Sequence, residues 1–534
     1  MMNFDYLIVG GGSAGATLAA RLSEDPANTI GLIETGGYGD DLLIRMPVGL
    51  SAIVPGRLKS NNYRYETIPQ AGLHGRSGYQ PRGRCLGGSS AINAMCYIRG
   101  HRNDYDDWAS LGCPGWSFDE VLPYFKRSEG NQRGASELHG GTGPLQVGEQ
   151  QSPRPISHAF VKAALEVGLP ANPDFNGAEQ EGVGFYQVSQ FFHGPKNGER
   201  CSAAAAYLHP VMHRPNLTVL THTQALRVML EDKRAVGVEV QRAGQRQVIH
   251  ANKEVILCGG AFNSPQLLML SGIGDPAELT RHGIQVRHEL PGVGKNLQDH
   301  IDFILNYTSK DSDLLGFSPS AAMHIPGAIQ EWSKTGKGLL ASPIAESGGF
   351  VKSDPQLARP DLQLNFVIAL LDDHGRKLRY GNGFSAHVCV LRPKSVGELG
   401  LVDSNPLSAP RIDPQFLSHP DDVAVLLKGA RLLQKIIQAP AMSHILDKPL
   451  LEIDQLSDEE LIEHIREHAD CIYHPIGTCK MGTDPLAVVD PQLRVHGITG
   501  LRVVDASIMP TLIGGNTNAP TIMIAERAAA FIRA

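Results

Sequence analysis

Near the start of the chain, residues 6–15 read Tyr6-Leu7-Ile8-Val9-Gly10-Gly11-Gly12-Ser13-Ala14-Gly15. Its four leading apolar residues form an uninterrupted run, as a buried parallel strand does. Gly10, Gly12 and Gly15 fit the spacing GxGxxG, and residues 16–22 predict a helix. The first glycine permits a tight turn, the second admits a diphosphate to the backbone, and the third lets helix and strand pack closely. This order predicts a Rossmann-like unit that binds the ADP half of a dinucleotide.

The residues around this unit narrow the choice of dinucleotide. Phosphates are expected at the helix N-terminus, where Ser13 and Ala14 offer backbone N–H groups. A second predicted strand, residues 29–33, ends in Glu34, about 20 residues after the glycines. A carboxylate there accepts a hydrogen bond from a ribose hydroxyl and repels a 2′-phosphate. The pattern therefore disfavours NADP and leaves FAD or NAD.

The same residues also fit a competing motif. Gly11 to Gly15 match GxSxG, in which Ser13 would be the nucleophile of an α/β hydrolase. That interpretation leaves Glu34 unexplained, and no earlier strand and loop precede the motif to supply an oxyanion hole. We keep the hydrolase as the alternative from a different enzyme class.

Composition places the chain among ordinary globular proteins. It has 534 residues, of which 42% are hydrophobic and 19% charged. Because single cores stop growing near ~250–300 residues, we expect two domains or an interleaved pair. The net charge of −7, without a long Lys/Arg cluster, excludes a nucleic-acid surface. The oligomeric state is not predicted.

The lack of a recognisable targeting signal and the spacing of the cysteines predict an intracellular protein. No window is apolar enough to span a bilayer, and a basic start with a cleavage site is missing. The predicted compartment is the cytoplasm, with peripheral association at the inner membrane as the alternative. Eight scattered cysteines form no CxxC pair, so we expect buried free thiols rather than zinc ligands or disulfides.

Two further glycine-rich segments follow. The first is Gly83-Arg84-Cys85-Leu86-Gly87-Gly88-Ser89-Ser90-Ala91-Ile92-Asn93. The second covers residues 260–274, after a predicted strand at residues 254–257. It predicts a helix over residues 265–270 with Pro265 in its first position. Closely spaced glycines suit a backbone pressed against a flat or phosphorylated ligand.

Both segments resemble the two signature sequences of the glucose–methanol–choline (GMC) oxidoreductases, a family of FAD enzymes. Residues 290–300, 473–482 and 499–526 are similar to other segments of that family. The chain looks most like the bacterial branch that oxidises primary alcohols and like choline dehydrogenases. The resemblance implies a Rossmann-like FAD-binding domain interleaved with an antiparallel-sheet substrate-binding domain. We assign residues 1–151, 201–299 and 482–534 to the former and residues 152–200 and 300–481 to the latter. The alternating residues at 362–367 and 387–391 predict strands of the substrate-binding domain.

The resemblance also implies which residues contact FAD. Expected on the flavin side are Leu86, Gly88, Ser89, Asn93 and Met95. Ala225 is expected to touch the adenine through its backbone, and Asp505, Ala506 and Thr521 to surround the ribityl and diphosphate groups. Some family members link FAD covalently through a His just before the signature Asn. This chain has Ile92 there, so we predict noncovalent FAD.

Alcohol oxidation requires a base for the hydroxyl proton and an acceptor for hydride, and the flavin is that acceptor. His474 is the candidate base: Pro475 forces it into an extended conformation, which is expected to end the preceding helix. The resemblance places His474 on the family's catalytic histidine. It places Asn518 on the partner position, where an amide holds the substrate oxygen. Asn516 is interpreted as stabilising a turn.

Residues 464–468 spell H-x-x-E-H, a zinc-protease pattern. We interpret them as part of a solvated helix, capped by Ser457 with Glu460 completing a capping box, and expect no metal site.

The substrate is weakly constrained by the sequence. Loops at residues 44–57 and 317–347 carry apolar residues that suit a pocket entrance or a core cover. Choline would require an aromatic cage or a carboxylate, which the sequence does not locate. The resemblance favours a dehydrogenase that passes electrons to a quinone or dye. An oxygen-using alcohol oxidase and a non-enzymatic flavin-binding role are the alternatives.

Overall fold

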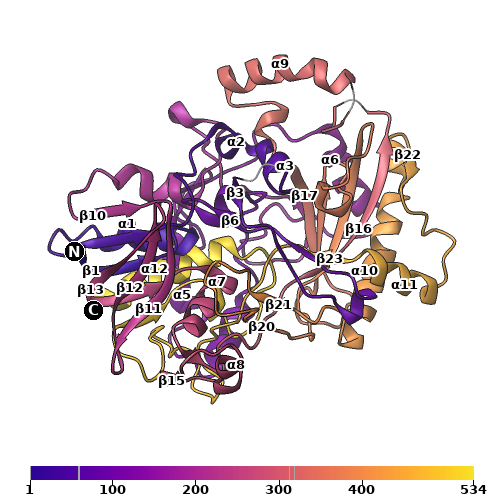
Figure 1. Ribbon diagram of the computed structural model, residues 1–534. Helices are drawn as coiled ribbons and strands as arrows, with labels where there is room; N and C mark the ends of the chain where they lie inside the picture. Colours follow the sequence, from indigo (N-terminus) through magenta and orange to yellow (C-terminus); the bar gives the residue numbers. More distant parts are fainter. Residues whose placement is uncertain (1, 58–59, 312, 318, 534) are drawn as a thin grey trace.

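Two sheets lie side by side in the computed structural model, which describes residues 2–57, 60–311, 313–317 and 319–533 (Figure 1). The first sheet occupies the left of Figure 1, on the side where both ends of the chain lie. The second sheet lies to the right and carries helices on its outer side. The architecture is therefore the predicted combination of a Rossmann-like α/β unit and an antiparallel-sheet unit.

The first sheet is parallel at its centre. Strands β10, β2, β1, β13 and β24 run parallel, while β12 and β11 extend the sheet beyond β13 in antiparallel fashion. The strands are β1 (Asn3–Val9), β2 (Ile30–Ile33), β10 (Leu217–Leu220), β11 (Thr223–Glu231), β12 (Arg234–Arg242), β13 (Gln245–Leu257) and β24 (Leu501–Val503). Helix α1 (Ser13–Leu22) crosses from β1 to β2 and begins three residues earlier than predicted, at Ser13.

Helix α12 (Asn518–Arg533), the last of the chain, packs against α1. Its Glu526 carboxylate is fully buried and accepts from the Arg21 guanidinium at 2.7 Å. The Tyr207 hydroxyl donates to the same carboxylate at 2.8 Å. This contact joins the first and last helices of the chain.

The predicted position of Pro265 at a helix start is wrong. Helix α7 runs over Gly260–Leu270 and contains Pro265 in its middle. Because proline has no N–H, the carbonyl of Ala261, four residues earlier, loses its helical partner. The Thr478 hydroxyl donates to that carbonyl at 2.6 Å, which explains how the helix continues through the proline.

The second sheet is antiparallel in the order β22-β16-β19-β18-β17-β9, and β23 also pairs with β16. The strands are β9 (Gly182–Phe185), β16 (Ile301–Ser309), β17 (Ala345–Val351), β18 (Leu362–Val367), β19 (Gly383–Val390), β22 (Leu446–Pro449) and β23 (Asp470–Cys471). Helix α10 (Pro420–Ile437) packs against β16, β18 and β19. Strand β18 has the bounds predicted from its alternating residues.

The two units share their cores across the predicted domain limits. Every strand of the first sheet comes from the ranges assigned to FAD binding, and every strand of the second from the remaining ranges. However, Leu399 and Ile412 pack into the first core, whereas Val48 and Ile98 pack into the second. The exchange means that neither core is complete without segments of the other unit.

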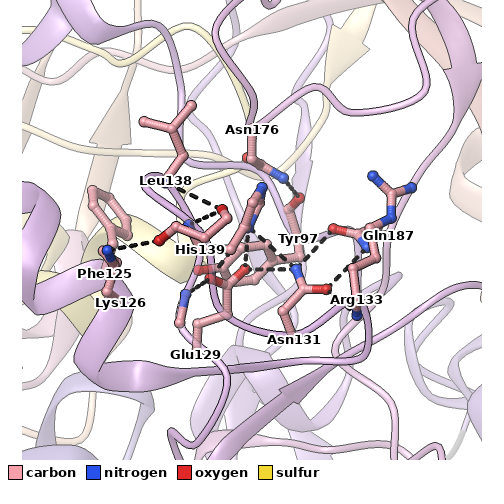
Figure 2. A network of polar contacts seen from close by, with 12 residues as sticks. Tyr97, Phe125, Lys126, Glu129, Asn131, Arg133, Leu138, His139, Asn176 and Gln187 are labelled. Atoms are coloured by element: carbon pink, nitrogen blue, oxygen red, sulfur yellow. Dashed lines mark hydrogen bonds and ion pairs between the residues drawn. The ribbon is translucent and has the colours of Figure 1, made fainter.

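A buried polar cluster fixes the segment that follows Met95 (Figure 2). His139 lies between two carboxylates, with Nδ1 3.0 Å from Glu129 and Nε2 2.9 Å from Asp174. The Tyr97 carbonyl accepts from the Asn176 amide at 2.9 Å. The Tyr97 contact ties this segment to a part of the chain distant in sequence, next to Met95 and Cys96, which line the cavity described below.

Within the described ranges, none of the helices combines the length and hydropathy of a membrane-spanning segment. All eight cysteines fall within these ranges, and each is free and buried, as predicted.

Candidate active site

One cavity of about 590 Å³ extends from the glycine-rich turn of the first sheet to the face of the second sheet. Its volume lies within the ~300–1,000 Å³ that is typical of ligand pockets. Gly10 and Glu34 lie at one end, and Asn365 and His387 of the second sheet lie at the other. The cavity therefore joins the predicted dinucleotide site to the predicted substrate unit.

The glycines of the first motif are required by close backbone contacts. A Cβ on Gly15 would lie 1.8 Å from the Gly10 carbonyl oxygen, so no side chain fits between α1 and the turn. Gly88 has φ +52°, and a Cβ there would lie 2.7 Å from Gly12 Cα. The second glycine segment thus lies directly against the first, and together they form a smooth backbone cradle.

Most residues predicted to bind the cofactor line this cavity. They are Gly10, Gly12, Ser13, Ala14, Glu34, Gly88, Ser89, Asn93, Met95, Ala225, Asp505, Ala506 and Thr521. Gly15 and Leu86 do not line it, because Gly15 packs on Gly10 and the Leu86 side chain packs over Gly11.

The donors and acceptors at this end fit an adenine dinucleotide. The N-terminus of α1 has no side-chain cap, so its N–H groups are free for phosphates. The Glu34 carboxylate accepts from the backbone of Gly11 and Gly36 at 2.9 and 2.7 Å, which fixes it at the end of β2. Asp505 Oδ2 accepts from Gly260 N at 2.8 Å and from Ser264 Oγ at 2.6 Å.

His474 lies in the wall of the cavity, in the loop after β23, and only 8% of it is exposed. Its imidazole Nδ1 lies 3.0 Å from His300 Nδ1, and its Nε2 lies 3.1 Å from Asn516 Nδ2. Burial lowers the pKa of His474 well below its ordinary value, and the charge of Arg82, together with that of His300 whenever His300 is protonated, acts in the same direction. The ring is therefore neutral at pH 7 and able to accept a proton.

Pro475 does not end the preceding helix as predicted. Helix α11 (Asp458–His468) already ends at His468, and Ala469 leaves it in an extended conformation. Strand β23 follows and pairs with β16, and this pairing determines where the loop that carries His474 begins.

The amide beside His474 belongs to Asn516 rather than Asn518, contrary to our prediction. Asn516 also accepts from Gln363 Nε2 at 3.1 Å through its Oδ1, so it does more than stabilise a turn. Asn518 is the first residue of α12, and its Oδ1 accepts from Ser13 Oγ at 2.8 Å. Pro520, near a helix start, was the available signal that Asn518 belongs to the helix.

Sequence reasoning missed several polar residues around His474. Asp299, His300 and Gln363 contact the loop or its Asn516 partner. The alternation of Gln363 and Asn365 within a predicted strand was the available signal, because residues two apart share one face of a sheet.

The substrate end of the cavity combines a paired carboxylate with apolar walls. The Asp302 carboxylate is buried, and its Oδ2 lies 2.7 Å from His387 Nδ1. Burial raises the pKa of Asp302, and His387 opposes this shift. Both segments predicted as entrance loops contribute lining residues, Leu50 and Val54 from one and Phe317 and Ile344 from the other. Their prediction as loops is wrong, because the first contains short helices and the second contains α9 (Pro319–Thr335).

The H-x-x-E-H pattern lies on α11, which begins with the predicted capping box of Ser457 and Glu460. His464, Glu467 and His468 offer ligand atoms within 4.8 Å of one another. None of the three lines the cavity, and Glu467 and His468 are exposed.

Comparison with known proteins agrees with this geometry. Models of the GMC oxidoreductase family match residues 4–302 and 393–525. The chain is 47% identical to an alcohol dehydrogenase [acceptor] of Pseudomonas putida over 99% of this chain and 95% of that one. It is 43% identical to human mitochondrial choline dehydrogenase, over 99% of this chain and 90% of that one. The crystal structure of pyridoxine 4-oxidase from Mesorbium loti superposes with a TM-score of 0.88 at 32% identity, covering 99% of both chains.

These matches overturn the hydrolase alternative. Ser13 would be the nucleophile of a hydrolase, but its hydroxyl donates to Asn518 Oδ1. The residue itself is the first of α1, directly after the glycine-rich turn. The family implies FAD as the cofactor. The chain belongs to the GMC oxidoreductase family and is an enzyme that acts on CH–OH donors.

Proposed function

We propose that the protein oxidises a primary alcohol to its aldehyde by hydride transfer to noncovalently bound FAD, with His474 as general base, and passes the electrons to a non-oxygen acceptor such as a quinone. The neutral imidazole of His474, with the Asn516 amide beside it in the cavity wall, carries this proposal. An oxygen-using oxidase of the same family is the alternative.

The residues proposed to hold FAD are those of the cradle. Backbone N–H groups at the start of α1 would bind the diphosphate, and Glu34 would accept from the ribose. Asp505 and Ala506 would lie along the ribityl chain. Ile92 lines the cavity at the position where some relatives attach FAD covalently, and its aliphatic side chain supports noncovalent binding. When bound, FAD supplies the hydride acceptor.

The protein would handle the proton. His474 Nε2 accepts the hydroxyl proton of the substrate, and one hydrogen of the Asn516 amide is directed at the substrate oxygen. The alcohol loses this proton from oxygen and a hydride from the carbon that bears the hydroxyl group, and an aldehyde remains. General base catalysis of this kind typically contributes ~10²–10⁴ in rate. Asn516 replaces Asn518 in the role that we assigned from the sequence.

The proposed substrate is a neutral alcohol with an apolar chain. Leu50, Val54 and Ile344 give the entrance an apolar surface. The cavity-lining carboxylate of the second sheet, Asp302 on β16, is already paired with His387, which makes it a poor partner for the quaternary ammonium of choline. The similarity to an alcohol dehydrogenase [acceptor] supports a non-oxygen acceptor.

The proposed location is the cytoplasm, with peripheral contact at the inner membrane. Helix α9 (Pro319–Thr335) stands out from the body at the top of Figure 1 and exposes Met323, Ile325 and Ile329. Phe317, which lines the cavity, is also exposed beside it. Replacing the three α9 residues by Ser should shift the protein from the membrane fraction to the soluble fraction of lysed cells. An unchanged distribution would count against membrane contact.

Anaerobic mixing with a panel of primary alcohols tests the function. Wild-type holoenzyme should lose its oxidised-flavin absorbance, and the His474→Ala variant should do so ~10²–10⁴ times more slowly. The His468→Ala variant, altered on exposed α11, serves as the matched control. Bleaching of His474→Ala at the wild-type rate would exclude His474 as the base. If no alcohol bleaches the wild type, the protein only binds flavin. Comparing oxygen consumption with dye reduction distinguishes oxidase from dehydrogenase.

A further inference from the structure

His300 and His474 belong to a chain of five polar contacts, two of which are to backbone carbonyls. His300 Nε2 lies 3.2 Å from the Leu391 carbonyl oxygen and 3.1 Å from that of Ile513. His300 Nδ1 lies 3.0 Å from His474 Nδ1. His474 Nε2 then meets Asn516 Nδ2, and Asn516 Oδ1 meets Gln363 Nε2.

The carbonyl end of the chain determines where its hydrogens lie. Carbonyl oxygens only accept hydrogen bonds, so His300 Nε2, which faces two of them, must carry its hydrogen. Burial lowers the pKa of His300 to about 4, so the ring is neutral and bears only that one hydrogen. His300 Nδ1 is therefore an acceptor.

The direction of the remaining contacts follows. An acceptor at His300 Nδ1 requires a hydrogen on His474 Nδ1, and a neutral His474 then has its lone pair on Nε2. Asn516 Nδ2 donates to that lone pair until the substrate hydroxyl replaces it, and Gln363 donates to Asn516 Oδ1, which keeps the amide in this orientation. The opposite arrangement would direct the lone pair of His300 Nε2 at two carbonyl oxygens, which is unfavourable.

We propose that His300 is a positioning residue that holds His474 in the Nδ1–H tautomer, with Nε2 available for the hydroxyl proton of the substrate. The inference rests on the proposed function, in which His474 is the base. Its physical basis is that the carbonyls of Leu391 and Ile513, fixed by the backbone, select the tautomer through His300. After proton transfer, the His474 imidazolium would still donate through Nδ1 to the same neutral acceptor.

Nitrogen NMR tests the tautomer without requiring turnover. In FAD-loaded enzyme labelled with ¹⁵N-histidine, the signals of His474 are those that disappear in the His474→Gln variant. We expect a protonated shift for Nδ1 and an unprotonated shift for Nε2. The reverse pattern would overturn the proposal, whether or not the enzyme oxidises alcohols. The NMR result therefore tests the tautomer separately from the flavin-reduction experiment, which tests the proposed function.

Two variants at His300 separate tautomer control from packing. His300→Leu removes the acceptor, whereas the amide oxygen of His300→Asn is able to accept from His474 Nδ1. In His300→Leu, flavin reduction at saturating alcohol should slow at least ~10-fold, with little change in substrate affinity. His300→Asn should restore most of the rate. The size of the effect is bounded by the Ser-His-Asp triad, in which loss of tautomer control costs about 10⁴-fold in rate. An unchanged rate and unchanged ¹⁵N pattern in His300→Leu would exclude the role. If His300→Leu does not fold, His300→Asn with an inverted tautomer would exclude it as well.

Discussion

The backbone N–H of His474 donates to Asp299 Oδ1 at 2.7 Å, across 175 positions of sequence. The same oxygen accepts from the backbone of His300 at 2.9 Å. One buried carboxylate therefore holds the main chain of both histidines. Burial raises the pKa of Asp299 to about 7, while the Arg82 charge opposes the shift.

Replacing Asp299 should misplace the proposed base. Asp299→Ala removes the acceptor shared by the two backbone groups, and we expect flavin reduction by alcohol to slow ~10–100-fold, since small displacements of reacting groups have costs of this size. Asp299→Asn keeps one carbonyl oxygen and should lose much less rate. Stopped-flow measurement of flavin bleaching compares the two variants. Equal losses in both would indicate that the charge of Asp299, rather than its acceptor oxygen, matters.

Asn516 and Asn518 should affect different properties. Asn516→Ala removes the amide beside His474, and we expect a ~10²–10³-fold lower reduction rate, as when one preorganised donor is lost. Asn518→Ala removes the contact with Ser13 and should weaken flavin retention with a smaller effect on the rate of loaded enzyme. Flavin-to-protein absorbance ratios and single-turnover rates separate the two effects. The reverse result would restore Asn518 as the substrate-side amide.

The Asp302–His387 pair should control selection against cationic alcohols. His387→Leu removes the partner of the carboxylate. At alkaline pH, where the carboxyl stays ionised without His387, we expect kcat/KM for choline relative to 1-butanol to rise about 10-fold, which corresponds to ~1.4 kcal/mol. Adding Asp302→Asn to this variant should abolish the gain because the charge is removed. A gain that persists in the double variant would show that a change in cavity shape causes it.

The buried His139 cluster predicts a pH dependence of stability. Burial by itself lowers the pKa of His139, but hydrogen bonds to Asp174 and Glu129 outweigh burial and raise the pKa to about 9. A raised histidine pKa stabilises the fold fully below the unfolded value of ~6.5, and this contribution disappears as the pH rises through about 9. His139→Gln should therefore cost about 1–3 kcal/mol near pH 6 and less near pH 9.5. Thermal unfolding of the wild type and the variant across this pH range measures the difference in their stability. A stability difference that does not change with pH would mean that His139 is uncharged in the folded protein.

Gly88 should be intolerant of any side chain. Its φ is +52°, and a Cβ added there would lie 2.7 Å from Gly12 Cα, so the two glycine segments must separate in Gly88→Ala. We expect the purified variant to retain little flavin while circular dichroism shows a folded chain. Gly327→Ala, on α9 with nothing within 4 Å of the added Cβ, is the matched control. Normal flavin content in Gly88→Ala would show that the cradle is not where FAD binds.

Elements whose signal lies within a few neighbouring residues are the ones that the sequence predicts correctly. The alternating residues of β18 and the capping residues of α11 carry their structural signal within a few positions, and both elements form as expected. Pro265 was misplaced because its tolerance within α7 depends on Thr478, more than 200 residues away. The local sequence contains no trace of that hydroxyl.

Long-range pairing likewise explains the errors at the site. His300 ends the family-like segment at residues 290–300, but its partner His474 is 174 positions later, and local spacing does not predict a contact between them. Asn516 and Asn518 are separated by one residue, and the start of α12 determines which amide meets His474. The chemistry of the residues was predictable, whereas their mutual orientation required the assembled fold.

The packing of α12 against α1 has a consequence for biosynthesis. Asp505, Asn516 and Asn518, which lie in the last 30 positions of the chain, line the same cavity as Gly10 and Gly12. A nascent chain that still lacks residues 505–518 therefore presents the glycine-rich turn without the residues that face it. If FAD binds in this cavity as proposed, we expect stable flavin uptake to follow the synthesis of those residues rather than to assist the folding of the first strand and helix.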